Sequence, residues 1–309
     1  MVARTTACAL VAALGLAVIA MAGPAVTAQV ASSAAHGQSI APVFEGWQEN
    51  PDGSFNLVFG YFNRNRVERI DIPVGPDNRF ESGTPDLGQP THFYPRRSRF
   101  LFKVRVPADF GDKELVWTLT SNGETERAYG SLLIDYFLDD TVLQNNKGAG
   151  GGAGGEYDIF GNIAPTLRID GPLTREVVVG EPLHLAAYAT DDGIPRPRSL
   201  LQVRRVTPDS SSGLWLAWFV YRGPGEEVSF DPLQASVWED TRPVSAGGNS
   251  NWSFGWEAPP APPDNKWEAT ATFDEPGTYV LRAWADDGGL MAYDDVTVVV
   301  TGDAAQNQQ

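Results

Sequence analysis

The chain has 309 residues, a formal net charge of −16 and a single cysteine. A surface this acidic repels nucleic acids and anionic lipids, so neither is expected as a partner. The length is sufficient for two domains of ordinary size, each with its own core.

The N-terminus is typical of a secretory signal peptide. Residues 1–28 carry one positive charge at Arg4, then an apolar stretch, then the small residues Val26 and Ala28 at positions suited to cleavage. We therefore expect cleavage after Ala28 and a mature chain that is secreted or periplasmic.

An uncleaved membrane anchor is the less favoured alternative. Gly23 and Pro24 interrupt the apolar run before it reaches the ~20 residues needed to cross a bilayer, and no later segment is long and apolar enough. Cys8 would leave with the signal peptide, which excludes disulfides and cysteine-ligated zinc from the mature chain.

The next segment, residues 29–41, is rich in alanine, serine and glutamine and is expected to be a disordered leader. Residues 42–140 predict a first β-sandwich domain. Phe55, Leu57 and Phe59 lie on one face of a predicted strand, and Asn122 with Gly123 predicts a hairpin turn. No helical period is found in this half.

Glycine dominates residues 147–156. Such a stretch has many accessible backbone conformations and nothing apolar to bury, so residues 141–161 are expected to form a flexible linker. A phosphate-binding loop is disfavoured because no Lys-Ser or Lys-Thr pair follows the glycines.

Residues 162–302 predict a second β-sandwich, followed by a disordered tail at 303–309. Its clearest element is a hairpin in which Tyr279, Leu281 and Ala283 share one face before an acidic turn. The segment 223–264 is rich in proline, glycine and tryptophan and is longer than a plain sandwich requires, which indicates an insertion. The predicted fold class is therefore all-β, with two Ig-like β-sandwich domains joined by a glycine-rich flexible linker.

Three motifs of this second half carry a family resemblance. They are N-x-A-P-T from Asn162, V-x-x-G-E-P-L-x-L-x-A-x-A-x-D-D-G from Val177, and F-x-x-P-G-T-Y-x-L-x-A-x-A-D-D-G from Phe273. In this order they resemble PKD-like and cadherin-like Ig sandwiches of bacterial secreted proteins. The resemblance implies a spacer, an adhesion unit or an adjunct to an enzyme. The first half resembles Ig-like or fibronectin-like modules in pattern alone.

Three pairs of consecutive aspartates are candidate calcium ligands: Asp191 with Asp192, Asp286 with Asp287, and Asp294 with Asp295. Calcium takes about six to eight oxygen ligands, which loops at one end of a sandwich could supply. The favoured alternative is that Asp-Asp-Gly serves turn formation with solvated carboxylates. Calcium is the only cofactor that the sequence suggests, and none is certain.

Tryptophans gather in the second half. Trp238, Trp252 and Trp256, in the insertion, are candidates for a flat platform that binds glycans. Plain packing is the favoured alternative, because each indole buries a large apolar area. Trp215 and Trp284 lie on clear strand patterns and are expected to be core or sheet-surface residues.

Catalysis finds little support in the sequence. His36 is in the leader, His92 is in a proline-flanked loop, and His184 lies within a strand, where an interior position is expected. They form no metal-binding cluster and no convincing Ser-His-Asp set.

The leading functional hypothesis is therefore an exported, non-catalytic structural or interaction module of the bacterial envelope or extracellular space. Its partner would be a protein or a glycan. A carbohydrate-binding module that uses exposed tryptophans is the alternative, and a secreted hydrolase of β-sandwich type is a third, less favoured one.

Overall fold

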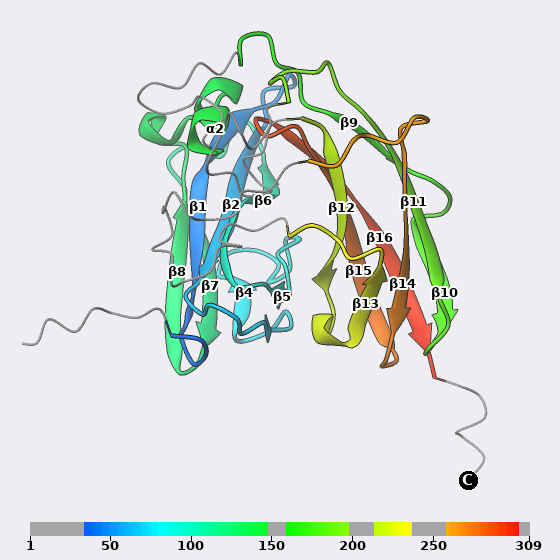
Figure 1. The fold of residues 1–309 in the computed structure, drawn as a ribbon. Helices are drawn as coiled ribbons and strands as arrows, with labels where there is room; N and C mark the ends of the chain where they lie inside the picture. The colour runs from blue at the N-terminus through cyan, green and yellow to red at the C-terminus, as the bar shows by residue number, and fades with distance from the viewer. Residues whose placement is uncertain (1–33, 148–158, 198–212, 237–257, 303–309) are drawn as a thin grey trace, which may run out of the picture. The chain divides into compact units, whose positions relative to one another are not determined.

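The structure is a computed structural model that describes residues 34–147, 159–197, 213–236 and 258–302 (Figure 1). Within these ranges the regular secondary structure is almost entirely β-strand, which confirms the predicted all-β class. The glycine-rich residues 148–158 lie outside the described ranges.

The first sandwich has two antiparallel sheets (Figure 1). One has the order β1-β2-β6 and the other β4-β7-β8, with a short pair β3-β5 beside them. The bounds are β1 Ile40–Glu49, β2 Phe55–Asn63, β3 Ile70–Asp71, β4 Asn78–Phe80, β5 His92–Phe93, β6 Arg96–Val106, β7 Leu115–Ser121 and β8 Glu124–Gly130.

The alternation read from the sequence defines this core. Leu57 and Phe59 are fully buried, and the ring of Phe59 contacts those of Phe102 and Trp117 at centroid distances of 5.6 and 6.1 Å. The predicted turn joins β7 to β8, with φ of 48° at Asn122 and 81° at Gly123, the left-handed conformations that a tight hairpin turn needs.

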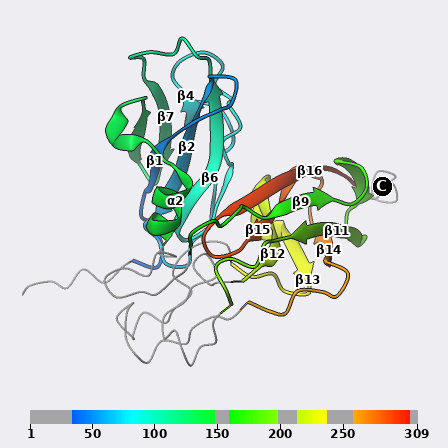
Figure 2. The same ribbon diagram turned by 90° about the horizontal axis from the view of Figure 1, so that it is seen from above.

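Helix α2 (Asp140–Lys147) follows a 3-10 turn, η1 (Ile134–Tyr136), and was not predicted. Asp139 caps it, since the carboxylate Oδ1 accepts from the Val142 N–H at 2.7 Å. Leu143 is buried in a cluster with Val58 of β2 and Phe100 of β6. Figure 2 shows helix α2 beside these strands. Two turns with so little apolar surface give no readable helical period, which explains the missed element.

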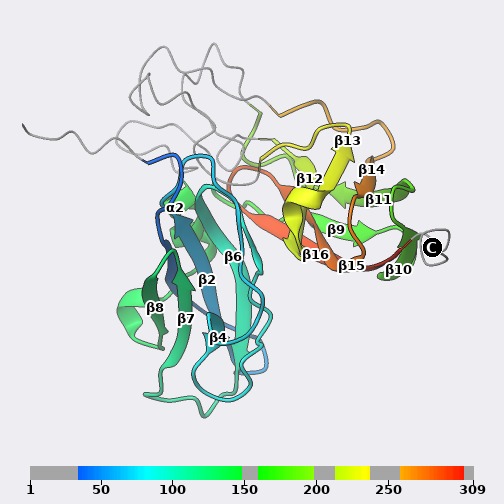
Figure 3. The same ribbon diagram turned by 90° about the horizontal axis from the view of Figure 1, so that it is seen from below.

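The second sandwich has one sheet of order β10-β16-β15-β12 and another of order β13-β14-β11-β9 (Figure 3). Only the β10–β16 pair is parallel among the described strands. The bounds are β9 Thr166–Ile169, β10 Thr174–Val178, β11 Leu183–Thr190, β12 Trp215–Arg222, β13 Val228–Asp231, β14 Lys266–Phe273, β15 Gly277–Asp286 and β16 Met291–Thr301, with a 3-10 turn η3 at Gly225–Glu227. This arrangement is an Ig-like β-sandwich.

The predicted hairpin is β15–β16, and its inner face is confirmed. Tyr279, Leu281 and Ala283 are fully buried, as are Val296 and Val298 on the partner strand. They pack against the opposite sheet in a single apolar core.

The outer face of β12 and β15 is buried as well. Trp215, Phe219 and Tyr221 of β12 and Trp284 of β15 belong to the apolar cluster of the first sandwich. The Val220 N–H donates to the Tyr94 hydroxyl at 3.0 Å across the same boundary. The two sandwiches therefore share a continuous core, and residues from Ala34 onward form one compact unit.

In the described part of the chain, no helix has the length and apolar character needed to cross a membrane.

Candidate functional site

The structure separates the three predicted aspartate pairs. Asp286 and Asp287, at the β15–β16 turn, are fully buried. Asp191 is half-buried at the end of β11, and burial, followed by the charges of Asp192 and Asp286, raises its pKa. Asp294 lies on β16 opposite Ala283 of β15. Asp191 is thus close enough to the β15–β16 turn to interact with Asp286. The pair Asp294 and Asp295 lies further along β16.

Asp286 is held by a lysine from helix α2. Lys147 Nζ lies 2.6 Å from Asp286 Oδ2, and the two side chains are only 3% and 1% exposed. The same oxygen accepts from Trp284 Nε1 at 3.0 Å, and Oδ1 accepts from the Gly288 N–H at 2.7 Å. Donors therefore surround this carboxylate on both oxygens, as burial of its charge requires.

Asp287 sits in the turn itself. Its Oδ1 accepts from the N–H groups of Gly289 and Leu290 at 2.5 and 2.7 Å, whereas its buried Oδ2 has no hydrogen-bond partner. Burial, and then the charge of Asp286, raise the pKa of Asp287 to about 7, although Lys147 opposes the shift. Asp287 is therefore largely a neutral acid below neutral pH.

Two amides complete the cluster. Asn162 Nδ2 donates to Gln144 Oε1 at 2.8 Å, and Asn162 Oδ1 is buried without a partner. A Cβ at Gly289 would come within 2.7 Å of Gln144 Oε1 and 2.8 Å of Asn162 Nδ2, so any larger residue would displace these two amides.

Sequence reasoning missed Gln144 and Lys147, because both lie on the unpredicted helix. Nothing in the sequence around Lys147 pointed to a buried ion pair, apart from its position directly before the glycine-rich stretch. Asn162 opens the N-x-A-P-T motif, which was the available clue to its role.

Asp295 serves another cation. Arg282, on β15, pairs with both of its carboxylate oxygens, Nε to Oδ1 at 2.7 Å and the other nitrogen to Oδ2 at 2.8 Å. The guanidinium lies 3.6 Å from the ring centroid of Tyr221 and 4.0 Å from that of Tyr293. Its remaining nitrogen donates to the Leu101 carbonyl of β6 at 2.5 Å. Arg282 thus anchors β15 to the first sandwich.

These pairings bear on the calcium hypothesis. Across residues 34–147, 159–197, 213–236 and 258–302, no three acidic, histidine or cysteine side chains are grouped to hold a metal ion. Lys147 and Arg282 already neutralise Asp286 and Asp295. We therefore expect millimolar calcium to leave the melting temperature of residues 29–309 unchanged relative to EDTA. A ligand that binds only the native state would raise it. A rise that disappears in Asp191→Asn would contradict this expectation.

The buried Asp287 predicts a pH dependence of stability. Its pKa is about 7 in the folded chain, against about 3.9 in an unfolded one. Between these values the folded state binds the extra proton, so the free energy of unfolding falls as pH rises from about 4 to 7, by at most about 1.4 kcal/mol per pH unit. Urea unfolding of wild type and Asp287→Asn at pH 5 and pH 8 checks this. The free energy of unfolding of wild type, relative to that of Asp287→Asn, should be higher at pH 5 than at pH 8. The same change with pH in both proteins would contradict the raised pKa of Asp287.

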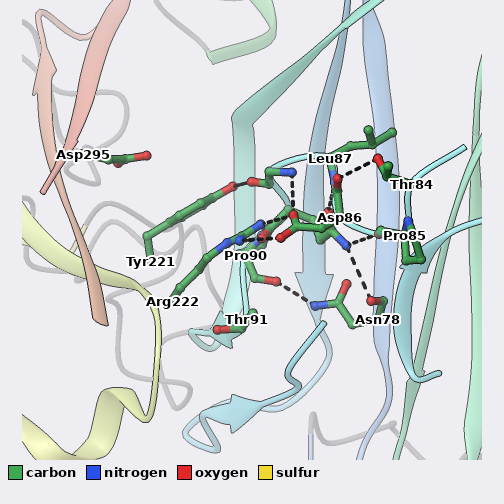
Figure 4. A network of polar contacts seen from close by, with 12 residues as sticks. Asn78, Thr84, Pro85, Asp86, Leu87, Pro90, Thr91, Tyr221, Arg222 and Asp295 are labelled. Carbon is green, nitrogen blue, oxygen red and sulfur yellow. Dashed lines mark hydrogen bonds and ion pairs between the residues drawn. The ribbon is translucent and has the colours of Figure 1, made fainter. Parts of the chain in front are cut away.

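A second polar network lies where residues 84–91 meet β12 (Figure 4). Arg222 forms a bidentate pair with Asp86 at 2.7 and 3.0 Å, and its Nε donates to the Gln89 carbonyl at 2.8 Å. The Tyr221 hydroxyl donates to the Gly88 carbonyl. These contacts hold the loop against the second sandwich, beside a cavity of about 460 Å³ lined by Asp71, Arg222 and Pro224.

Two histidines differ from expectation. His92 is not in a loop but in β5, where it is buried with Nδ1 2.6 Å from Asp71 Oδ1. His184 was expected in the interior but its side chain is 64% exposed and lies 3.4 Å from Glu268. It points outward because its neighbours Leu183 and Leu185 share the opposite face of β11, which is the one that packs into the core.

The tryptophans divide into two groups. Trp215, Trp218 and Trp284 are buried, which confirms the packing expected for Trp215 and Trp284. The glycan candidates Trp238, Trp252 and Trp256 lie outside the described residues. Among the described residues, a cavity of about 450 Å³ is lined by Trp215, Trp218, Pro232, Gln234, Trp267 and Glu268.

No protein-family model matches the chain, and no curated protein matches it. Among solved structures it is similar to the immunoglobulin domains 1–4 of Sidekick-1, with 11% identity over 84% of this chain and 47% of that chain, at a TM-score of 0.22. It is also similar to the fibronectin(III)-like modules of Clostridium thermocellum CbhA, with 11% identity, 85% and 95% coverage and a TM-score of 0.21. It is similar as well to domains 4 and 5 of the S-layer protein SbsC, with 9% identity over 62% of this chain and 66% of that chain, at a TM-score of 0.23. TM-scores this low carry no argument for function, and the Ig-like fold is established by the sheets themselves.

Proposed function

We propose that the chain is an exported, non-catalytic structural or interaction protein that acts at the bacterial envelope or in the extracellular space. The signal-type N-terminus supports export. The shared core supports a structural role, because it joins the two sandwiches into a single rigid unit.

The observation that carries this proposal is the double burial of β12. All but the last of its eight residues are buried, since one face packs inside its own sandwich and the other against the first. Arg282 adds a buried charge that reaches a carbonyl of the first sandwich. Such an interface transmits force and fixes the spacing of the outer surfaces, which a scaffold or adhesion protein requires.

The proposal is tested in two steps. Expressed with its N-terminus in a bacterial host, the chain should leave the cytoplasm and begin at Gln29 in N-terminal sequencing. Calorimetry of the mature chain should then give one cooperative transition, because the outer face of β12 and β15 is buried in the apolar cluster of the first sandwich, which couples the unfolding of the two. Retention in the cytoplasm with residues 1–28 intact would contradict export, and two well-separated transitions would contradict a single rigid unit.

Carbohydrate binding is a second candidate, favoured by the tryptophan-lined cavity. Trp267 is half-buried there, with Gln234 and Glu268 as polar neighbours suited to sugar hydroxyls. Pull-down of the mature chain on insoluble polysaccharides tests it. Binding that is lost in Trp267→Ala assigns this cavity, binding lost only in Trp252→Ala or Trp256→Ala assigns the insertion, and no binding to any polysaccharide removes the candidate.

A further inference from the structure

The Lys147–Asp286 pair differs from a surface ion pair in its burial and in the distance along the chain between its two residues. The two residues are 139 positions apart in the chain, come from helix α2 and the end of β15, and are almost completely buried at 2.6 Å. Two buried charges lose their hydration, and their attraction compensates this cost only in part. An amide bond between the same two side chains would remove both charges.

We propose that Lys147 and Asp286 condense to an isopeptide bond, with the neighbouring Asp287 as the acid. The bond that forms joins Lys147 Nζ to Asp286 Cγ, and the bond that breaks joins Cγ to one carboxylate oxygen. An ammonium and a carboxylate become an amide and one water, so the step needs no oxidant, reductant or co-reactant.

The surroundings provide what the reaction requires. Attack needs a neutral amine, so the ammonium proton must first move from Lys147 Nζ to the Asp286 carboxylate oxygen that lies 2.6 Å away. Trp284 Nε1 and the Gly288 N–H each donate to an oxygen of Asp286, where they polarise Cγ and stabilise the oxyanion of the tetrahedral intermediate. The pair is held in contact by packing, which replaces a bimolecular encounter with an intramolecular one.

We assign to Asp287, the next residue in the chain, the role of returning a proton to the leaving hydroxyl. Its Oδ1 is occupied by two backbone N–H groups, so Oδ2, which has no other partner, carries the proton of the neutral acid. Burial raises the pKa of Asp287 to about 7, so this acid is largely neutral below that pH. Lys147 is close enough to act on the Asp287 charge.

The bond would join the end of the first half of the chain to the closing hairpin of the second. A cross-link between distant residues restricts the unfolded chain and stabilises the folded one. The mature chain has no cysteine with which to form a disulfide, so this amide would supply the covalent bracing that exported proteins commonly obtain from cystines.

The intact mass of the purified mature chain decides the proposal. We expect a mass below that of the sequence by one water, and a branched tryptic peptide that joins Lys147 to Asp286. Lys147→Arg keeps the positive charge but cannot form this amide, and Asp287→Asn keeps the turn but removes the acid. Both should show the full sequence mass, whereas the exposed Lys113→Arg should still lack one water.

Two results would overturn the inference. The first is a folded wild-type chain with the full sequence mass, which would leave Lys147–Asp286 a buried ion pair. The second is a water loss that persists in Lys147→Arg, which would point instead to a succinimide at the Asp287-Gly288 step. Hydroxylamine identifies that species, because it cleaves the chain at a succinimide and leaves an isopeptide bond intact.

Discussion

Replacement of Arg282 by methionine is expected to lower the free energy of unfolding by about 3 kcal/mol, because it removes one partner of a buried ion pair and leaves the other. Methionine retains the apolar stem but not the guanidinium. Asp295 then loses both of its contacts to the guanidinium, and the Leu101 carbonyl loses a donor at 2.5 Å. The rings of Tyr221 and Tyr293 lose the cation between them. Urea unfolding of the mature chain measures the change.

Arg168→Met is the matched control. Arg168 also lies over a tyrosine ring, at 4.5 Å from the centroid of Tyr188, but its side chain is 67% exposed and its nearest carboxylate, on Asp170, is 4.0 Å away. Water compensates for such a loss, so this variant should differ from wild type by less than about 1 kcal/mol. Equal losses in the two variants would show that burial and the contact to β6 contribute nothing.

The strands of the chain could be predicted because each has one face in a core. Alternation placed Leu57 and Phe59 inside the first sandwich and Tyr279 and Leu281 inside the second, and these residues are buried. The Asn122-Gly123 turn was equally readable, because a two-residue hairpin requires left-handed backbone that these residue types favour.

The contact between the sandwiches could not be predicted. On β15 the outward positions hold Arg282 and Trp284, and both are buried. Strand alternation says which side chains share a face and nothing about what covers that face. An arginine beside a tryptophan is compatible with either environment.

The candidate site was predicted in part for a similar reason. The sequence drew attention to Asp286 and Asp287 as an acidic turn, which suggested solvated carboxylates or calcium ligands. Their burial depends on Lys147 and Gln144, which arrive from a helix too short to show a period. A residue whose role comes from a partner 139 positions away leaves no local pattern.

A loss of similar size is expected from Asn78→Leu. Leucine has the same branched skeleton of side-chain heavy atoms as asparagine and is bulkier, but it has no polar atoms. Asn78, on β4, is completely buried within the network of Figure 4. Its Nδ2 donates to the carbonyls of Ile72 and Pro90 at 2.9 and 2.8 Å, and its Oδ1 accepts from Trp117 Nε1 at 3.0 Å.

The variant leaves these three partners buried without a hydrogen bond, and each such group costs about 1 to 3 kcal/mol. Relaxation recovers part of this, so we expect the free energy of unfolding to fall by about 3 kcal/mol in urea. Asn145→Leu, at an exposed position of helix α2, is the same chemical change and should stay within about 0.5 kcal/mol of wild type. A small loss in Asn78→Leu would mean that water reaches the carbonyls of Ile72 and Pro90. In that case the loop of residues 84–91 would be held by Arg222 and the Tyr221 hydroxyl rather than by this asparagine.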